Sequence, residues 1–346
     1  MNQSYISEDA WKIIEIGFQP DRVRGAESIF SIGNGAMGQR ANFEEYYSGP
    51  SFQGSYIGGV YYPDKTRVGW WKNGYPEFFA KVLNAPNWIG IDIEINELPL
   101  DLFAAKKIHQ FSRELNMEKG LYTRKFELEM TNGTHLRAVV KRFVSMDQTE
   151  MGAIEYNIEL LSENASFNIA PYLSGRIKNE DSNWEDPFWS HLQSETDHQS
   201  AYLVSKTLKT EFHVCTYMHT ELNLNGTPLQ KNVTQFSADD KSGFKAEFKL
   251  YKGDQINITK YGGYITSLNH SKENLKSLAK QKVNEALDKG FLKLYQNHTD
   301  CWAKIWEISD IKIKGDLSAQ QGIRFNIFQP NFVRVIHLLC PISIFA

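Results

Sequence analysis

Cysteine is scarce in this chain, and so is any grouping of residues that bind metals. The three cysteines, Cys215, Cys301 and Cys340, are odd in number, lie far apart and lack the spacing of metal ligands. The nine histidines contain no His-x-x-x-His pattern or comparable cluster. We therefore expect no metal ion or other cofactor, and a reduced protein of the cytoplasm.

Long apolar segments and an excess of one charge are also missing. No stretch approaches the about 18 uninterrupted apolar residues of a membrane-spanning helix. The N-terminus, MNQSYISEDAWKII, has no basic patch followed by an apolar run, as a signal peptide would have. The net charge of −3 attracts neither nucleic acid nor an anionic membrane, so neither is expected as a partner.

Residues for a core are plentiful. Hydrophobic residues make up 41% of the 346 and charged residues 23%, which favours a folded chain over a disordered one. The length allows two or three domains, or one large β domain with an appendage. Aromatic residues reach 13%. Their rings suit sugar binding, because pyranose rings stack on aromatic faces, but a ring-rich core explains the same number.

Alternating apolar and polar residues indicate β-strands up to about residue 268. From Ile89 to Ile95 every second residue is isoleucine, and the residues between are Gly90, Asp92 and Glu94. A period of two places one face of a strand in the core. Similar alternation recurs at 136–141, 154–160, 245–250 and 256–258. Many such strands joined by short turns predict antiparallel sheets packed face to face, and not a doubly wound fold.

The period changes to that of helices near residue 270. Apolar residues at a 3.6-residue spacing predict one helix over 271–288, with Ser271 as its N-cap, and a second over 291–307. Asp288-Lys-Gly290 interrupts them, and a further helix fits 319–329. Amphipathic helices of this kind need a partner that buries their apolar stripes.

The last 17 residues, PNFVRVIHLLCPISIFA, differ from the rest of the chain. Eleven of them are apolar, no acidic residue follows Asp316, and Pro341 breaks the run. The tail has neither helical nor strand periodicity, and its single charge between Phe332 and Phe345 is Arg334. We expect it to promote self-association unless it folds back over an apolar stripe.

Several longer motifs point together to a known family. They are ESIFSIGNG (27–35), MGQRANFEE (37–45), YPDKT (62–66), VGWWKNGYPEFFAKVLNAPNWIGI (68–91), FSRELNM (111–117), WAKIW (302–306) and DLSAQQGIRFNIFQ (316–329). In these motifs the chain resembles glycoside hydrolase family 65. The block at 68–91 resembles the maltose phosphorylases of that family more than its trehalose or kojibiose phosphorylases. The resemblance covers residues 8–329.

The resemblance implies a mainly β fold. Residues 1–268 would form an antiparallel super-sandwich similar to galactose mutarotases, 269–309 two linker helices, and 310–329 the first part of an (α/α)6 barrel. In the family the barrel continues beyond Gln329, whereas here the atypical tail 330–346 follows, which we interpret as a truncation or frameshift. The linker helices would then lose part of their burial, exposing some of their large apolar side chains: Leu275, Leu278, Val283, Leu287, Leu294, Trp302 and Trp306.

The resemblance also implies an activity, the inverting phosphorolysis of maltose to β-glucose 1-phosphate and glucose. Phosphate is already an anionic nucleophile, so such an enzyme needs one carboxylic acid and a phosphate pocket, but no base. In the family both belong to the barrel, and no position here matches them. We therefore predict no catalytic residue and a chain that is inactive alone. Inorganic phosphate and a maltose-like disaccharide would be substrates of the full-length enzyme, and the resemblance allows a homodimer.

Two other functions stay open. The chain could be a self-sufficient carbohydrate-binding β-sandwich, or a module for assembly. Binding of maltose to the isolated chain would separate the first of these from an inactive enzyme fragment.

One segment is a candidate for binding substrate. Trp70, Trp71, Lys72 and Asn73 lie between two glycines, which predicts a loop. This loop could serve as a platform for a sugar, or as an aromatic plug between sandwich and barrel.

Two further segments have a superficial likeness to functional sites. Segment 179–189 mixes acids with tryptophans as a glycosidase cleft does, but a solvated loop with buried tryptophan anchors explains it as well. Its acids and tryptophans are Glu180, Asp181, Trp184, Glu185, Asp186 and Trp189. Residues 33–38, GNGAMG, resemble a phosphate-cradling loop but lack its Lys-Ser/Thr, so we predict a glycine-dependent turn.

Overall fold

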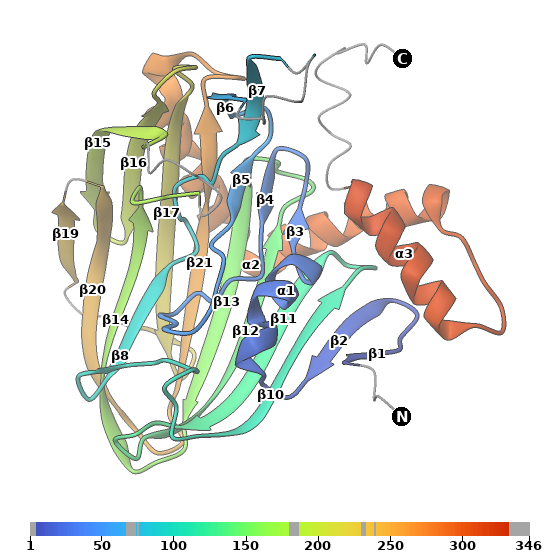
Figure 1. Cartoon of the computed structure of the whole chain (residues 1–346). Coiled ribbons are helices and arrows are strands. Elements are labelled where there is room, and N and C mark those ends of the chain that lie inside the picture. Colours follow the sequence, from blue (N-terminus) through green and yellow to red (C-terminus); the bar gives the residue numbers. More distant parts are fainter. Residues whose placement is uncertain are drawn as a thin grey trace.

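The structure, a computed structural model, describes residues 5–66, 74, 76–179, 187–229, 233–238 and 240–331. Antiparallel strands dominate this part of the chain (Figure 1). The largest sheet has eleven strands. Its order is β1 (Ile6–Ser7), β2 (Lys12–Ile16), β10 (Lys107–Asn116), β11 (Leu121–Glu129), β12 (His135–Val144), β13 (Met151–Leu160), β21 (Gln255–Thr266), β17 (His213–Leu224), β16 (Ser200–Thr207) and β15 (Trp189–Asp197), with β18 (Thr227–Pro228) paired to β17.

A second sheet of five strands packs against one part of the first. Its order is β19 (Thr234–Ala238), β20 (Lys241–Tyr251), β14 (Asn164–Ser174), β8 (Ile91–Ile95) and β9 (Leu98–Pro99). Strands β14 and β20 lie against β16 of the large sheet. Two minor sheets complete the described strands: β3 (Ile32–Gly33), β4 (Met37–Gln39) and β5 (Ser55–Ile57) form one, and β6 (Tyr61–Lys65) and β7 (Phe78–Val82) the other.

The main core lies between the two large sheets. Ile91, Ile93 and Ile95 of β8 are fully buried, and the rings of Phe167 and Phe248 stack with centroids 6.0 Å apart. The large sheet contributes inward residues from β11, β12, β13 and β21: Phe126, Leu128, Leu136, Ala138, Val140, Tyr156, Ile158, Ile256 and Ile258. The antiparallel super-sandwich that the alternating pattern predicts is confirmed, as is the strand within Ile89–Ile95.

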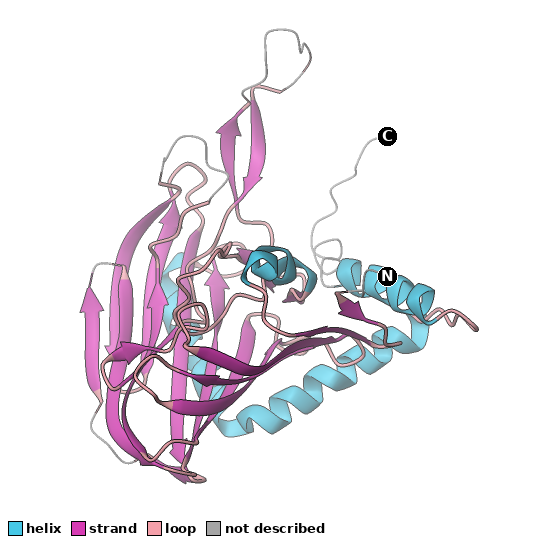
Figure 2. Cartoon of the chain, turned by 60° about the horizontal axis from the view of Figure 1, so that its bottom comes forward, coloured by secondary structure: helices cyan, strands magenta, loops and turns pink. Residues whose placement is uncertain are grey.

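A long helix, α2 (Leu275–Ser309), lies on the outer face of the large sheet (Figure 2). Its backbone is non-helical at Gly290 (φ 68°, ψ 167°), where the sequence predicts a break between two helices. Ser271 occupies the N-cap position of the 3-10 turn that leads into the helix, whereas the N-cap of α2 itself is Asn274. A 3-10 turn, η2 (Lys272–Asn274), precedes α2, and the Ser271 side chain makes no capping hydrogen bond.

The apolar stripe of α2 is buried, which corrects the expectation of exposed helices. The outer face of the large sheet is itself apolar where the helix crosses it. Before Gly290, Leu275, Ala279, Val283 and Ala286 pack on this face, and after it Phe291 and Leu294 do. Trp302 and Trp306 are buried too, whereas Leu287 keeps 37% of its surface exposed.

Two further helices complete the described elements. The short α1 (Val23–Ile29), preceded by the 3-10 turn η1 (Pro20–Arg22), was not expected from the sequence. The last helix, α3 (Leu317–Asn331), packs beside the first strands. Gln321 Nε2 donates to the carbonyl oxygens of Ser7 (2.8 Å) and Lys12 (2.7 Å), and Arg324 Nη1 donates to that of Ala10 (3.1 Å). None of the described helices is both long and apolar enough to span a membrane.

Candidate functional site

The segment predicted to bind substrate, Trp70, Trp71, Lys72 and Asn73, lies outside the described residues. In the sequence it falls between β6 and β7, whose hairpin stands at one end of the sandwich (Figure 1). Both interpretations of this segment, a sugar platform and an aromatic plug, stay predictions.

The acidic segment 179–189 is described only at its ends. Asn179 Nδ2 donates to the Val82 carbonyl oxygen (2.8 Å), and its Oδ1 accepts from the Asn84 N–H (2.9 Å). Trp189 is half-buried and its Nε1 donates to the Asn84 carbonyl oxygen (2.8 Å), so it is the structural anchor that the bland interpretation predicts. Its other acids and its second tryptophan, Glu180, Asp181, Trp184, Glu185 and Asp186, lie outside the described residues.

The glycine-rich segment 33–38 forms a turn between β3 and β4, as predicted. Gly35 has a φ of 87°, a conformation that favours glycine. The buried Asn34 closes the turn, because its Oδ1 accepts from the N–H groups of Ala36 (3.0 Å) and Met37 (2.9 Å). With these N–H groups already bonded, the turn has no free cradle for a phosphate.

A buried network of charges, which the sequence analysis missed, crosses the interior of the sandwich. Arg124 of β11 binds both Glu44 (Nη2 to Oε2, 2.9 Å) and Glu45 (Nη2 to Oε2, 2.6 Å). Arg142 of β12 binds the other oxygen of Glu44 (2.6 Å) and donates to the carbonyl oxygen of Asn42 (3.1 Å). The ionic side chains of all four charged residues are 0% exposed.

A third arginine of the same inner face, Arg113 of β10, pairs with Glu15 of β2. Its guanidinium lies 5.4–6.0 Å from the ring centroids of Phe30, Phe43 and Phe111. Both Nη atoms are buried without a hydrogen-bond partner among the described residues. This arginine is therefore held by one carboxylate and by aromatic faces.

The network fixes one loop, residues 40–54, against the sheet. From outside the loop, Glu27 accepts hydrogen bonds from Ser51 and from the Phe52 N–H (2.8 Å). Burial raises the pKa of Glu27, although both of these donors act in the opposite direction. Within the loop, Asn42 donates to the Phe52 carbonyl oxygen (2.8 Å) and accepts from the Gly54 N–H (3.0 Å). Charged and amide side chains thereby fix both arms of the loop.

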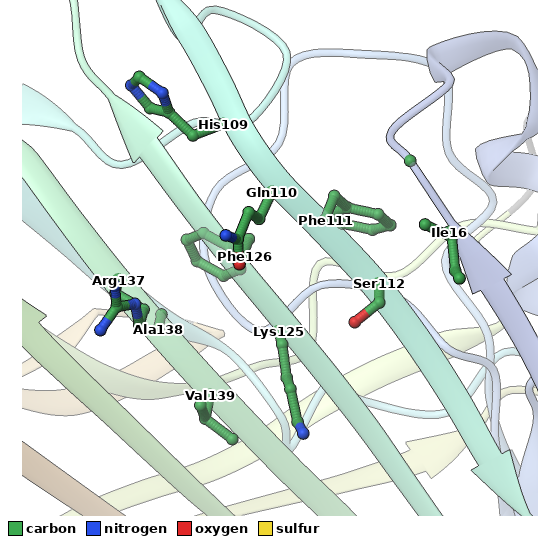
Figure 3. A pocket seen from close by; sticks show the side chains of 11 residues that line it. Ile16, His109, Gln110, Phe111, Ser112, Lys125, Phe126, Arg137, Ala138 and Val139 are labelled. Carbon is green, nitrogen blue, oxygen red and sulfur yellow. The ribbon is translucent and has the colours of Figure 1, made fainter.

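Several surface hollows among the described residues mark where a ligand could bind. Figure 3 shows one of about 470 Å³ on the outer face of β10, β11 and β12. Its polar side chains include Lys125 and Arg137, and Arg137 is already paired with Glu127 (2.8 Å). A second hollow, of about 740 Å³, lies at the end of the small sheet beside Tyr251. A third, of about 180 Å³, lies beside the fixed loop. No cluster of three or more potential metal ligands exists among the described residues.

The described residues form an antiparallel super-sandwich with a long helix packed on its outer face. A solved structure from the human microbiome, assigned as a kojibiose phosphorylase, has this fold with a TM-score of 0.83 and 27% identity, over 94% of this chain and 42% of that one. The family model "Glycosyl hydrolase family 65, N-terminal domain" matches residues 13–305. The chain belongs to glycoside hydrolase family 65.

Curated relatives agree with this assignment. Maltose phosphorylase of Bacillus subtilis (strain 168) is 39% identical over 95% of this chain and 43% of its own length. The α,α-trehalose phosphorylase of Thermoanaerobacter brockii is 28% identical over 94% and 43%, and the kojibiose phosphorylase of the same organism is 24% identical over 93% and 41%. The chain thus spans less than half the length of the curated relatives it matches.

Proposed function

We propose that this chain serves as the N-terminal sandwich of a phosphorylase that acts on maltose. The observation that carries the proposal is the gradient of identity over nearly the same span: 39% to the maltose phosphorylase, against 28% and 24% to the trehalose and kojibiose enzymes. The substrates would be maltose and inorganic phosphate, the reaction would invert the glucosyl carbon, and the cytoplasm would be the location.

In this reaction the sandwich would help to bind the substrate and would not supply the catalytic acid. Phosphate attacks the anomeric carbon, and a carboxylic acid protonates the leaving glycosidic oxygen. We place that acid outside this chain. The segment Trp70–Asn73 would reach toward the sugar, because two indole rings with a cation and an amide combine a stacking face with hydrogen-bond donors. The sandwich would hold this segment while the catalytic groups come from elsewhere.

The test has two arms. The purified chain is incubated with maltose and phosphate, and glucose 1-phosphate is measured; we expect none. The chain is then co-expressed with the portion of the Bacillus subtilis maltose phosphorylase that it does not match, and phosphorolysis should appear. The matched control uses the corresponding portion of the trehalose phosphorylase, which should remain inactive with maltose.

Phosphate-dependent turnover that follows the isolated chain through purification would refute the assignment of the acid to another segment. Failure of the co-expressed pair, when both parts are soluble and associate, would refute the role as the N-terminal sandwich of this enzyme.

A further inference from the structure

The hollow of about 180 Å³ beside the loop 40–54 differs in its lining residues from the hollows of about 470 and 740 Å³. It lies on the outer face of the small sheet, where the loop 40–54 meets β8 and β14. Its volume equals that of about six water molecules, at roughly 30 Å³ each, which is the room that one pyranose ring with its hydroxyls occupies. The loop contributes Tyr46 and Gln53, and the sheet contributes Asp92 and Tyr172.

The side chains around this hollow favour a neutral, hydroxyl-rich ligand. Four aromatic rings, four amides, two carboxylates and a serine line it, and no lysine, arginine or histidine does among the described residues. Both carboxylates are already paired with cations, Asp92 with Lys241 (3.0 Å) and Glu45 with Arg124 (2.6 Å), so these pairs bring no net charge to the hollow. Phosphate needs cationic or N–H donors, whereas amides and carboxylates pair with sugar hydroxyls and rings cover the apolar face of a pyranose.

Two of these residues, Tyr46 and Gln53, are available to a ligand. Tyr46 keeps 51% of its surface exposed. The Gln53 side chain makes no hydrogen bond to the described residues. The Tyr47 hydroxyl also has no partner among them, but it is buried, so a ligand in the hollow would not reach it without a movement of the loop. Burial, with a contribution from the nearby Asp101 carboxylate, raises the pKa of Tyr47 to about 12, so its hydroxyl remains a donor.

The hollow is also preformed. Glu45, one of its lining residues, is held by Arg124, and Asn42 bridges the two arms of the loop. On the sheet side the Tyr172 ring covers Gly90, where a Cβ would overlap it, and Lys241 Nζ lies 3.9 Å from the ring centroid. A ligand would therefore meet fixed groups and would lose little affinity to ordering the site.

We propose that this hollow is a non-catalytic binding site for one neutral pyranose unit of a glucoside. The inference does not depend on the proposed enzymatic role, because the site lies wholly within the described residues and needs no barrel. A phosphorylase whose sandwich holds a glucosyl unit would retain substrate near the enzyme between turnovers.

The experiment measures binding of maltose and of glucose to the purified full chain by saturation-transfer NMR and by titration. The variants are Tyr46→Ala and Gln53→Ala. Tyr251→Ala is the matched control, since Tyr251 is a tyrosine of similar exposure (63%) beside the 740 Å³ hollow. We expect both test variants to bind about three- to tenfold more weakly, as loss of one aromatic or hydrogen-bonding contact predicts, and Tyr251→Ala to bind like the parent.

Three results would overturn the proposal. The first is that the parent binds neither sugar. The second is that Tyr251→Ala weakens binding while Tyr46→Ala does not, which assigns the sugar to the other hollow. The third is that inorganic phosphate displaces the sugar, which marks an anion site. Unchanged thermal unfolding of Tyr46→Ala and Gln53→Ala confirms that any loss of binding is local. A negative result here leaves the co-expression test of the proposed enzyme unaffected.

Discussion

The three arginines inside the sandwich, Arg113, Arg124 and Arg142, have no exposed surface. Removing an ion from water so completely costs several kcal/mol, and the cost is offset only when partners are close and well oriented. The partners of Arg124 and Arg142, Glu44 and Glu45, both belong to the loop 40–54. The network therefore couples the loop to the sheet. Without the loop the two arginines would lose their carboxylates, and without the arginines the loop glutamates would be buried as unpaired charges.

Arg124→Met tests this coupling. The substitution keeps an unbranched side chain of similar length but leaves Glu45 buried without its cation, which should lower the free energy of unfolding by about 3–5 kcal/mol. Urea titration measures the change. The control is Arg137→Met, on the outer face of the neighbouring strand, where the pair with Glu127 is exposed to solvent and its loss should leave stability almost unchanged. Equal effects of the two substitutions would contradict the role given to burial.

The sequence contains one indication of this network. It becomes visible when the alternation of Leu136, Ala138 and Val140 is continued along the strand. The next residue in phase is Arg142, a charge at an inward position. Arg124 likewise falls in phase with Tyr122 and Phe126. Such residues predict a buried ion pair, but the partner cannot be identified, because Glu44 and Glu45 lie 79 to 98 residues away in a loop without periodicity.

His298 of α2 makes stability depend on pH. Its Nδ1 accepts from the Met146 N–H (3.1 Å), and its Nε2 donates to the Gly120 carbonyl oxygen (3.2 Å). Burial lowers the pKa of His298 from 6.5 to about 4. Between these two pH values His298 is protonated in the unfolded chain but neutral in the folded chain. The residue therefore lowers the free energy of unfolding as pH falls from about 6.5 toward about 4.

The expected size of this effect can be measured against a variant. Between about pH 7 and pH 5, His298 should contribute a loss of about 2 kcal/mol in the free energy of unfolding. His298→Gln removes the titration, so its stability should fall by that much less over the same range. Buried carboxyls such as Glu27, whose pKa is raised, contribute with the opposite sign in both proteins and cancel in the difference. Parallel curves for parent and variant would contradict the prediction.

At the scale of elements, periodicity predicts the strands and the two halves of α2 well, because burial on one face imposes the pattern. It fails for α1, whose seven residues include Gly25 and are too few for a helical stripe. That helix is stabilised by contacts distant in sequence, with Val23, Ala26 and Glu27 buried. For the candidate site, the aromatic content of the sequence was compatible with sugar binding. The hollow itself could not be predicted, because it forms where a loop meets two strands that are distant in sequence.

Gly290 separates the two packed halves of α2. Its φ of 68° and ψ of 167° belong to a region that only glycine adopts readily, and a Cβ there would contact nothing within 4 Å. Gly290→Ala should therefore lower the free energy of unfolding by about 1–3 kcal/mol through backbone strain alone. Gly322→Ala, in α3 and equally open, should instead raise it by up to about 1 kcal/mol, because alanine favours a regular helix. Thermal and urea unfolding of both variants measure the contrast.

For the whole molecule, apolar surface is the property that governs behaviour in solution. Exposed side chains follow one another from the end of α2 to the start of α3: Ile308, Ile311, Ile313 and Leu317. The apolar tail, of which 332–346 lies outside the described residues, would add to this surface. Deletion of 330–346 should raise soluble yield and shift sedimentation toward the monomer. If the parent chain is already monomeric and the deletion lowers its soluble yield or causes self-association, the tail is instead a structural cap over this apolar surface.

The contact between α3 and the first strands has a consequence for synthesis on the ribosome. The bond from Gln321 to Ser7 joins residues 314 positions apart. At about 5–20 residues per second, the first strands wait roughly 15–60 seconds after their own translation before the helix that covers them exists. Once β10 has been made and has paired with β2, this edge of the sheet stays uncovered until α3 follows, and an uncovered edge can pair with another nascent chain. We therefore expect mispairing of this edge to occur mainly between nascent chains on neighbouring ribosomes of one messenger RNA.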